Sequence, residues 1–224
     1  MDLLVKICGI TNLADARYCA GAGADMLGFI QHEESPRYVT PGIVQEMNEW
    51  LYGPEMVGVF VNESADTVNR IADEAGFTMV QLHGTESVET CQAIERPIIK
   101  AFPVVHDAAS DQLRPLIAPY RDVVDYVLLD TASSSVWGGT GESFNWRLVR
   151  ELTDEFPVLL AGGIGADNVA EAVNTMKPRG IDLASSVEQA PGQKDFDKLA
   201  DLFDAVDALR AEQPQQDEPQ DASS

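Results

Sequence analysis

Eight short apolar runs, each followed by a segment of helical character, constrain the fold of this chain most strongly. The runs lie at residues 5–7, 26–30, 56–61, 79–82, 98–102, 126–129, 158–161 and 181–183. Strands that are apolar along their whole length are typical of a parallel sheet that is covered on both faces. Eight regular alternations in 224 residues therefore predict an α/β fold, a single (β/α)₈ TIM barrel, and favour it over an open doubly wound sheet.

Helix-start signals support this pattern. Asn12 and Ser64 are suitable N-caps for helices that end near residues 23 and 75, and Pro41 suits the first turn of a helix over 41–51. Further helices are expected at 85–94, 110–120, from about 145, at 166–176 and at 195–210. We expect one barrel domain over residues 1–211. Gln, Pro, Asp and Ser dominate residues 212–224, which predicts an acidic disordered tail.

The charge balance indicates which partners to expect. The chain carries 37 acidic and 15 basic residues, for a net charge of −22, and only five of the basic residues are Lys. Such a surface repels nucleic acid and anionic membranes, so neither is expected as a partner. An acid-rich, Lys-poor surface favours a halophilic origin with a salt-rich cytoplasm, because salt screens the self-repulsion. The alternative is an ordinary acidic protein with an acidic tail.

The cysteines indicate a reducing compartment. Cys8, Cys19 and Cys91 form no CxxC pair, which argues against a disulfide framework and a structural zinc site. His32 and His106 have no partner at metal-ligand spacing, so no metal is expected. We see no secretory signal and no apolar stretch of membrane-spanning length. The expected location is the cytoplasm, and the short loops favour a monomer.

Two candidate proton-transfer groups lie where strands end. Cys8 closes the first strand and Asp130 follows the sixth, and in a barrel these ends meet at one rim. A thiol there can act as a base if its pKa suits the reaction, whereas a buried structural Cys is the common alternative. An Asp at such an end can be a proton donor, or can merely cap its loop.

Glycines and hydroxyls late in the chain predict a phosphate site. Gly162 and Gly163 follow the seventh strand, and Ser185 and Ser186 follow the eighth. Barrels often bind phosphate with these two loops, because glycines let backbone N–H groups approach the anion. Gly141, in the long loop after the sixth strand, is a candidate for a further donor. Tight turns that need glycine for conformational reasons are the alternative.

Three other polar residues are candidates for substrate binding. Arg37, after the second strand, has a planar fork that matches a carboxylate or phosphate, unless it forms only a surface salt bridge. Gln81 and His83 share one face at the end of the fourth strand. His83 is equally suited to donate to ligand oxygens or to cap the strand. Asp182, within the eighth strand, is expected to orient neighbouring groups.

These segments, in this order, resemble the phosphoribosylanthranilate isomerases of tryptophan biosynthesis. The resemblance covers all eight strands and excludes only the acidic tail. Each motif is weak by itself, and their order and spacing around one barrel make the match specific. The matching segments are residues 6–11, 35–39, 58–62, 81–84, 129–130, 138–141, 161–163 and 187–195.

The resemblance implies an Amadori rearrangement of N-(5-phosphoribosyl)anthranilate without any cofactor. It implies that Cys8 is the general base at the sugar C2 and that Asp130 is the general acid at the ring oxygen. Arg37 would hold the anthranilate carboxylate. Ser186 stands where the family pattern has glycine, which raises the question of backbone strain there.

Two alternatives stay open from the sequence. One is a related phosphosugar-isomerising barrel enzyme of histidine biosynthesis, for which an Asp would be expected in place of Cys8. The other is a non-catalytic barrel that binds a phosphate ligand, which would not require Cys8 and Asp130.

Overall fold

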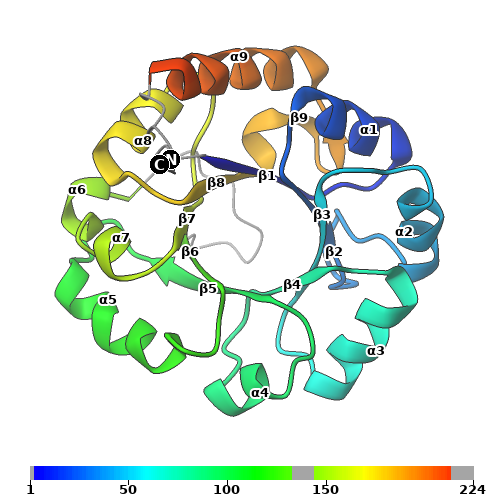
Figure 1. The fold of residues 1–224 in the computed structure, drawn as a ribbon, viewed down its shortest axis with the longest axis horizontal. Coiled ribbons are helices and arrows are strands. Elements are labelled where there is room, and N and C mark those ends of the chain that lie inside the picture. Colours follow the sequence, from blue (N-terminus) through cyan, green and yellow to red (C-terminus); the bar gives the residue numbers. More distant parts are fainter. Residues whose placement is uncertain (1–2, 133–143, 213–224) are drawn as a thin grey trace, which may run out of the picture.

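Eight parallel strands close into a barrel, and helices surround it (Figure 1). The structure is a computed structural model that describes residues 3–132 and 144–212. Each strand pairs with the next strand in the sequence, and β8 closes the barrel against β1. The prediction of a (β/α)₈ TIM barrel is confirmed.

The strands match the predicted apolar runs, with one shift that concerns the candidate site. Asp130 lies inside β6 instead of after it. The reason is that β5 continues two residues beyond its apolar run, so that Pro103 pairs with Asp130 and Val104 with Thr131. The strands are β1 (Leu4–Cys8), β2 (Met26–Ile30), β3 (Glu55–Phe60), β4 (Met79–Leu82), β5 (Ile98–Val104), β6 (Tyr126–Thr131), β7 (Val158–Leu160) and β8 (Gly180–Leu183).

The predicted N-caps are confirmed. The Asn12 side chain accepts from the backbone N–H of Asp15 at 2.9 Å, and Ser64 accepts from that of Thr67 at 3.2 Å. The helix expected at 85–94 is shorter, because Ser87 caps it three residues in. The helices are α1 (Leu13–Ala22), α2 (Pro41–Asn48), α3 (Ala65–Ala75), α4 (Val88–Gln92), α5 (Ser110–Ile117), η1 (Ala118–Tyr120), α6 (Trp146–Val149), α7 (Leu152–Glu155), α8 (Val169–Met176), η2 (Ser185–Val187) and α9 (Phe196–Glu212).

Two apolar clusters form the core. The larger cluster lies between the strands and the surrounding helices, and the smaller one fills the barrel. The interior cluster consists of inward-facing side chains of the barrel: Met26, Val57, Met79, Ile99, Ala101, Leu128, Leu159 and Ala161. Side chains alternate along a strand, so residues two positions further along also face inward. Gln81 and Asp130 are such residues, and each lies nearer the carboxyl end of its strand.

A small hairpin after β8 was not predicted. Strands β9 (Glu188–Ala190) and β10 (Gln193–Lys194) pair antiparallel and lie outside the barrel sheet. Thr11 donates its hydroxyl to the Gly192 carbonyl at 2.5 Å, and the backbone N–H of Lys194 donates to Asp15 at 2.9 Å. These contacts attach the hairpin to the segment that follows β1.

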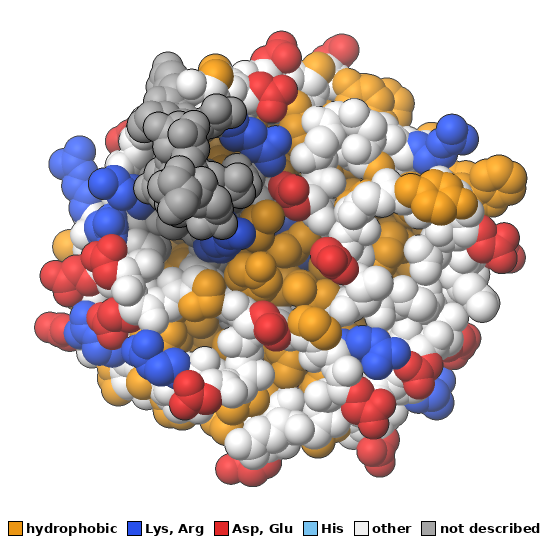
Figure 2. All heavy atoms as spheres, in the orientation of Figure 1, with side chains coloured by type: hydrophobic (Ala, Val, Ile, Leu, Met, Phe, Trp, Pro, Cys, Tyr) orange, Lys and Arg blue, Asp and Glu red, His pale blue; other side chains and the backbone are white. Residues whose placement is uncertain are grey.

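Acidic side chains are dispersed around the face in Figure 2, where they alternate with basic ones, and hydrophobic side chains gather near its centre. This dispersal agrees with a negative charge spread over the barrel. The predicted tail was to begin at Glu212, but helix α9 includes this residue. The remainder of the predicted tail, residues 213–224, lies outside the described residues. Within residues 3–132 and 144–212, no helix has the length and apolarity needed to span a membrane.

Candidate active site

The two candidate proton-transfer residues occupy inward positions at the carboxyl ends of their strands. Cys8 is the last residue of β1 and is 7% exposed, whereas Asp130 on β6 is half-buried. Strands β1 and β6 lie on different sides of the barrel (Figure 1), so their inward side chains face one common mouth. The structure thus brings together residues that are far apart in the sequence.

The thiol of Cys8 is enclosed by neighbouring strands. Gly28 is its partner on β2, and a Cβ atom added there would lie 2.8 Å from the sulfur. Burial raises the pKa of the Cys8 thiol, and the ammonium groups of Lys6 and Lys194 oppose that rise. Lys6 is itself fully buried, and its Nζ lies 2.9 Å from a carboxylate oxygen of Asp182. Cys8 therefore presents, on β1, a thiol that is largely excluded from water and close to two cations.

Asp130 belongs to a second polar group. Its carboxylate lies 3.5 Å from Nε2 of His83, and Nδ1 of His83 lies 2.8 Å from the amide nitrogen of Gln81. An amide nitrogen can only donate, so Nδ1 of His83 is the acceptor in this contact. The ring proton of a neutral His83 then lies on Nε2, on the side of Asp130. Gln81 and His83 therefore lie together with Asp130, and Gln81 orients His83. The charges of Asp130 and His83 also act on Asp182, which links this group to Lys6 and Cys8.

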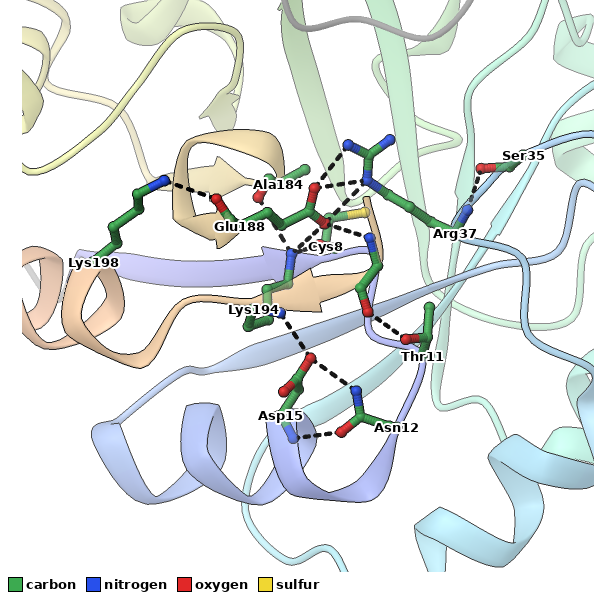
Figure 3. A network of polar contacts seen from close by, with 11 residues as sticks. Cys8, Thr11, Asn12, Asp15, Ser35, Arg37, Ala184, Glu188, Lys194 and Lys198 are labelled. Atoms are coloured by element: carbon green, nitrogen blue, oxygen red, sulfur yellow. Dashed lines mark hydrogen bonds and ion pairs between the residues drawn. The ribbon is translucent and has the colours of Figure 1, made fainter. Parts of the chain in front are cut away.

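Arg37 reaches the Cys8 side of the barrel mouth. A Cβ atom on Gly9 would lie 2.7 Å from Cδ of Arg37, so glycine at this position lets the arginine pass over the residue after Cys8. The guanidinium forms a two-pronged ion pair with Glu188, at 2.8 Å for the shortest contact, and Lys194 binds the same carboxylate at 3.0 Å (Figure 3). The ion pair of Arg37 with Glu188 is therefore not a surface salt bridge, because the Arg37 side chain is 12% exposed and that of Glu188 only 3%.

The loops predicted to hold phosphate lie side by side. A Cβ atom on Gly165 would lie 3.8 Å from the Cβ atom of Ser186, which places the loops after β7 and β8 in contact. Gly162 and Gly163 both have positive φ angles, which favour glycine, and Gly163 and Ser185 are exposed. Ser186 is not among the described non-glycine residues with positive φ, so the expected strain is absent. Gly141 lies outside the described residues.

Three charged residues of the site were missed as functional candidates. Lys6, Glu188 and Lys194 are each at most 6% exposed. The signal for Lys6 was its position between two β-branched apolar residues, two places before Cys8 and thus on the same side of β1. Glu188 and Lys194 lie in one of the motifs quoted above. The sequence did not mark either residue as part of the site, because both lie on a hairpin whose strands are too short to predict from the sequence.

The described part of the chain offers no group of three His, Cys, Asp or Glu side chains arranged to hold a metal ion. A cavity of about 450 Å³ lies at the opposite end of the barrel, where the strands start, and is lined by Leu4, Met26, Met79 and Tyr126 among others. It contains none of the predicted site residues. The candidate site is the polar carboxyl end of the barrel.

The chain is a (β/α)₈ barrel with a buried thiol, a carboxylate and neighbouring cations around one mouth, a set of groups that is suited to acid–base chemistry. The family model described as N-(5'phosphoribosyl)anthranilate (PRA) isomerase matches residues 5–205. The chain therefore belongs to the N-(5'-phosphoribosyl)anthranilate isomerase family, and it is an isomerase of the aldose–ketose type.

Individual relatives agree with this assignment. The N-(5'-phosphoribosyl)anthranilate isomerase of Geobacter sulfurreducens is 46% identical over 203 residues, covering 89% of this chain and 96% of that protein. The solved structure of the isomerase from Thermotoga maritima has a TM-score of 0.85 at 34% identity, covering 93% of this chain and all of that one. Another solved structure of the enzyme, at 33% identity, TM-score 0.81 and the same coverage, is a complex with reduced 1-(o-carboxyphenylamino)-1-deoxyribulose 5-phosphate.

Proposed function

We propose that this chain converts N-(5'-phosphoribosyl)anthranilate to 1-(2-carboxyphenylamino)-1-deoxyribulose 5-phosphate by general acid–base catalysis. The observation that carries the proposal is the placement of Cys8 and Asp130 at inward positions of the same barrel mouth, with Arg37 crossing over beside Cys8. The names of the relatives and the product analogue held by a solved neighbour support it.

In the first step, Asp130 in its acid form protonates the ring oxygen of the furanose. The bond from C1 to that oxygen breaks, and the nitrogen lone pair forms an iminium with C1. The Cys8 thiolate then takes the proton from C2, a C1–C2 double bond forms, and the electron pair returns to nitrogen. Such proton transfers by positioned side chains contribute about 10²–10⁴-fold each.

The resulting enol becomes the ketone when C1 gains a proton and the enol oxygen loses one through water. Exchange with water restores the Cys8 thiolate and the Asp130 acid. Atoms and electrons balance without a redox partner, so we propose that the reaction needs no cofactor. Two groups with opposite tasks are held in different surroundings, as such a mechanism requires: Cys8 is buried near two cations, and Asp130 is half-exposed next to His83.

The remaining site residues would bind the substrate. We propose that Arg37 binds the anthranilate carboxylate, because its planar fork matches a carboxylate. Backbone N–H groups of Gly162, Gly163, Ser185 and Ser186 would bind the phosphate, with Gly141 as a further donor. Gln81 and His83 would contact the sugar beside Asp130, and the Gln81–His83 contact supports a fixed orientation for that role.

Replacing the two proton-transfer residues tests the mechanism. Cys8→Ala and Asp130→Asn should each lower kcat by about 10²–10⁴-fold, while the affinity for the reduced product analogue stays within a small factor. Turnover is followed by the fluorescence of freshly prepared phosphoribosylanthranilate. Cys91→Ala and Asp107→Asn are matched controls, because Cys91 lies on α4 and Asp107 is an exposed carboxylate. Full activity in Cys8→Ala would overturn the mechanism.

A separate variant tests the carboxylate contact. Arg37→Ala should raise KM more than it lowers kcat, because a clamp on an unreacting carboxylate binds substrate and transition state alike. The same variant should bind the reduced product analogue more weakly. An unchanged KM would assign Arg37 a purely structural role.

We also propose that the protein acts as a monomer in a reducing cytoplasm. Cys8, Cys19 and Cys91 are all free and buried, and the reaction needs Cys8 as a free thiol. One solved relative from Thermotoga maritima is described as dimeric, with monomers generated from it. Sedimentation equilibrium over a range of concentrations would decide, and a mass twice that of the chain would contradict the proposal.

A further inference from the structure

Glu188 and Lys194 lie on the hairpin after β8, yet both reach the carboxyl end of β1. The Lys194 ammonium is completely buried and donates to the Cys8 carbonyl at 2.6 Å, to the Ala184 carbonyl at 3.3 Å and to Glu188 at 3.0 Å. One lysine thus joins the ends of β1 and β8 to the hairpin, as Figure 3 shows. A buried ammonium with three oxygen partners is firmly held, because breaking any contact would leave buried polar groups unsatisfied.

The Glu188 carboxylate contacts two groups of the hairpin and also the guanidinium of Arg37. Its Oε1 accepts from Lys194 and, at 3.3 Å, from the backbone N–H of Gly192. Both oxygens also accept from Arg37: Nε lies 3.0 Å from Oε1 and 3.1 Å from Oε2, and Nη2 lies 2.8 Å from Oε2. Lys194 and Gly192 therefore fix the carboxylate in the position in which it meets the fork of Arg37.

This pairing determines which edge of Arg37 is left for a ligand. The Nε and Nη2 edge is occupied by Glu188, whereas Nη1 makes no hydrogen bond within residues 3–132 and 144–212. In Figure 3, one terminal nitrogen of Arg37 points away from Glu188. An arginine side chain has several rotatable bonds. Holding it in one geometry before the ligand arrives reduces the conformational entropy that is lost on binding.

We propose that Glu188, fixed by Lys194, is a positioning residue that aims Arg37 at the carboxylate of the substrate and so determines the preference for a carboxylated aromatic amine. The inference rests on the proposed role of Arg37 and goes beyond it, because it assigns the selectivity to a residue that does not touch the substrate. Glu188 and Lys194 also tie the Cys8 backbone to the same network. Carboxylate binding and the position of the base are thereby coupled.

The test compares two probes that differ only in the carboxylate. One is reduced 1-(o-carboxyphenylamino)-1-deoxyribulose 5-phosphate, and the other is the same molecule with a plain phenyl ring. The ratio of their dissociation constants measures carboxylate preference. A purely structural role for Glu188 would weaken both probes equally and leave the ratio unchanged.

In Glu188→Asp the charge remains, but the shorter side chain cannot reach Lys194 and Arg37 together. We expect the ratio to fall about tenfold, as for the weakening of one charge-assisted hydrogen bond. The matched control is Glu34→Asp, in the loop that also carries Arg37. Its side chain is 82% exposed, and the ratio should not change. If Glu188→Asp does not fold, Glu188→Gln, which keeps the length and one acceptor oxygen, should show the same fall.

Arg37→Ala separates the two possible failures. It should bring the ratio close to one, and adding Glu188→Asp in that background should change nothing further. A ratio unchanged in Arg37→Ala would overturn the carboxylate role of Arg37 and this inference with it. A ratio that collapses in Arg37→Ala but is unchanged, or higher, in Glu188→Asp and Glu188→Gln would overturn the inference alone.

Discussion

At the scale of single residues, the site depends on charges that act on one buried thiol. Burial raises the pKa of Cys8, while Lys6 lowers it and the Asp182 carboxylate raises it. A base works in its deprotonated form, so activity should be low at acidic pH and should rise with pH as the Cys8 thiol titrates. Because the Cys8 pKa lies above its ordinary value, that rise should occur on the alkaline side of neutrality.

Replacing Lys6 or Asp182 should shift the rise of activity with pH in opposite directions. Lys6→Met removes the cation that favours the thiolate, so the rise in kcat/KM should shift to higher pH by about one unit or more. Asp182→Asn removes a like charge, and the rise should shift to lower pH. The measurement is the pH profile of kcat/KM, supported by thiolate absorbance near 240 nm in each variant. Shifts of the same sign in both variants would contradict this account of Cys8.

Gly28 provides a second residue-scale prediction. A Cβ atom there would lie 2.8 Å from the Cys8 sulfur, closer than van der Waals contact allows. Gly28→Ala should therefore displace the thiol and lower kcat by about 10-fold or more, since small misplacements of reacting groups are costly. Gly42→Ala is the matched control, because an added Cβ atom there meets nothing within 4 Å. The control should keep its kcat and gain about 0.5–1 kcal/mol in the free energy of unfolding.

At the scale of elements, helix α3 supports the barrel and carries none of the candidate site residues. Ser64 begins α3 by accepting from the backbone N–H of Thr67. Ser64→Ala should cost about 1 kcal/mol of unfolding free energy, or about 2–4 °C in Tm for a chain of this size. Its kcat should not change, and Ser64→Asp should restore the Tm because Asp is also a good N-cap. A loss of kcat without a loss of Tm would mean that α3 contributes to the site directly.

At the scale of the whole molecule, charge should govern stability. The chain has a net charge of −22, and residues 213–224 hold only three of its acids, so most of that charge is spread over the barrel. At about 0.1 M salt the Debye length of ~10 Å leaves the carboxylates to repel one another. At about 1 M salt the Debye length falls to ~3 Å, so Tm should rise substantially between these conditions. Thermal melts in KCl measure this. A flat or falling Tm would remove the basis for proposing a salt-rich cytoplasm.

The acidic tail should be dispensable. Residues 213–224 contain few apolar side chains, so they can bury little surface. Truncation after Glu212, where α9 ends, should leave both turnover and Tm nearly unchanged. A large change in either would show that the tail contributes to the barrel or its site.

The sequence by itself determined the barrel and the strand ends on which the site lies. The reason is that both are encoded locally: apolar runs predict strands, Asn12 and Ser64 predict helix starts, and parallel strands in a closed barrel bring their carboxyl ends to one rim. Cys8, Arg37 and Asp130 could be proposed because each follows or ends such a run. The exact end of β6 could not, since it depends on pairing with the extended end of β5.

The tertiary structure alone decided how these residues are held. Lys6 meets Asp182 because β1 pairs with β8 when the barrel closes, and the two residues are 176 positions apart in the sequence. Arg37 meets Glu188 across 151 positions, and Lys194 meets the Cys8 carbonyl across 186. Contacts between buried charges of such separation leave no periodic signal in the sequence, because their energy depends on three-dimensional distance and on exclusion of water.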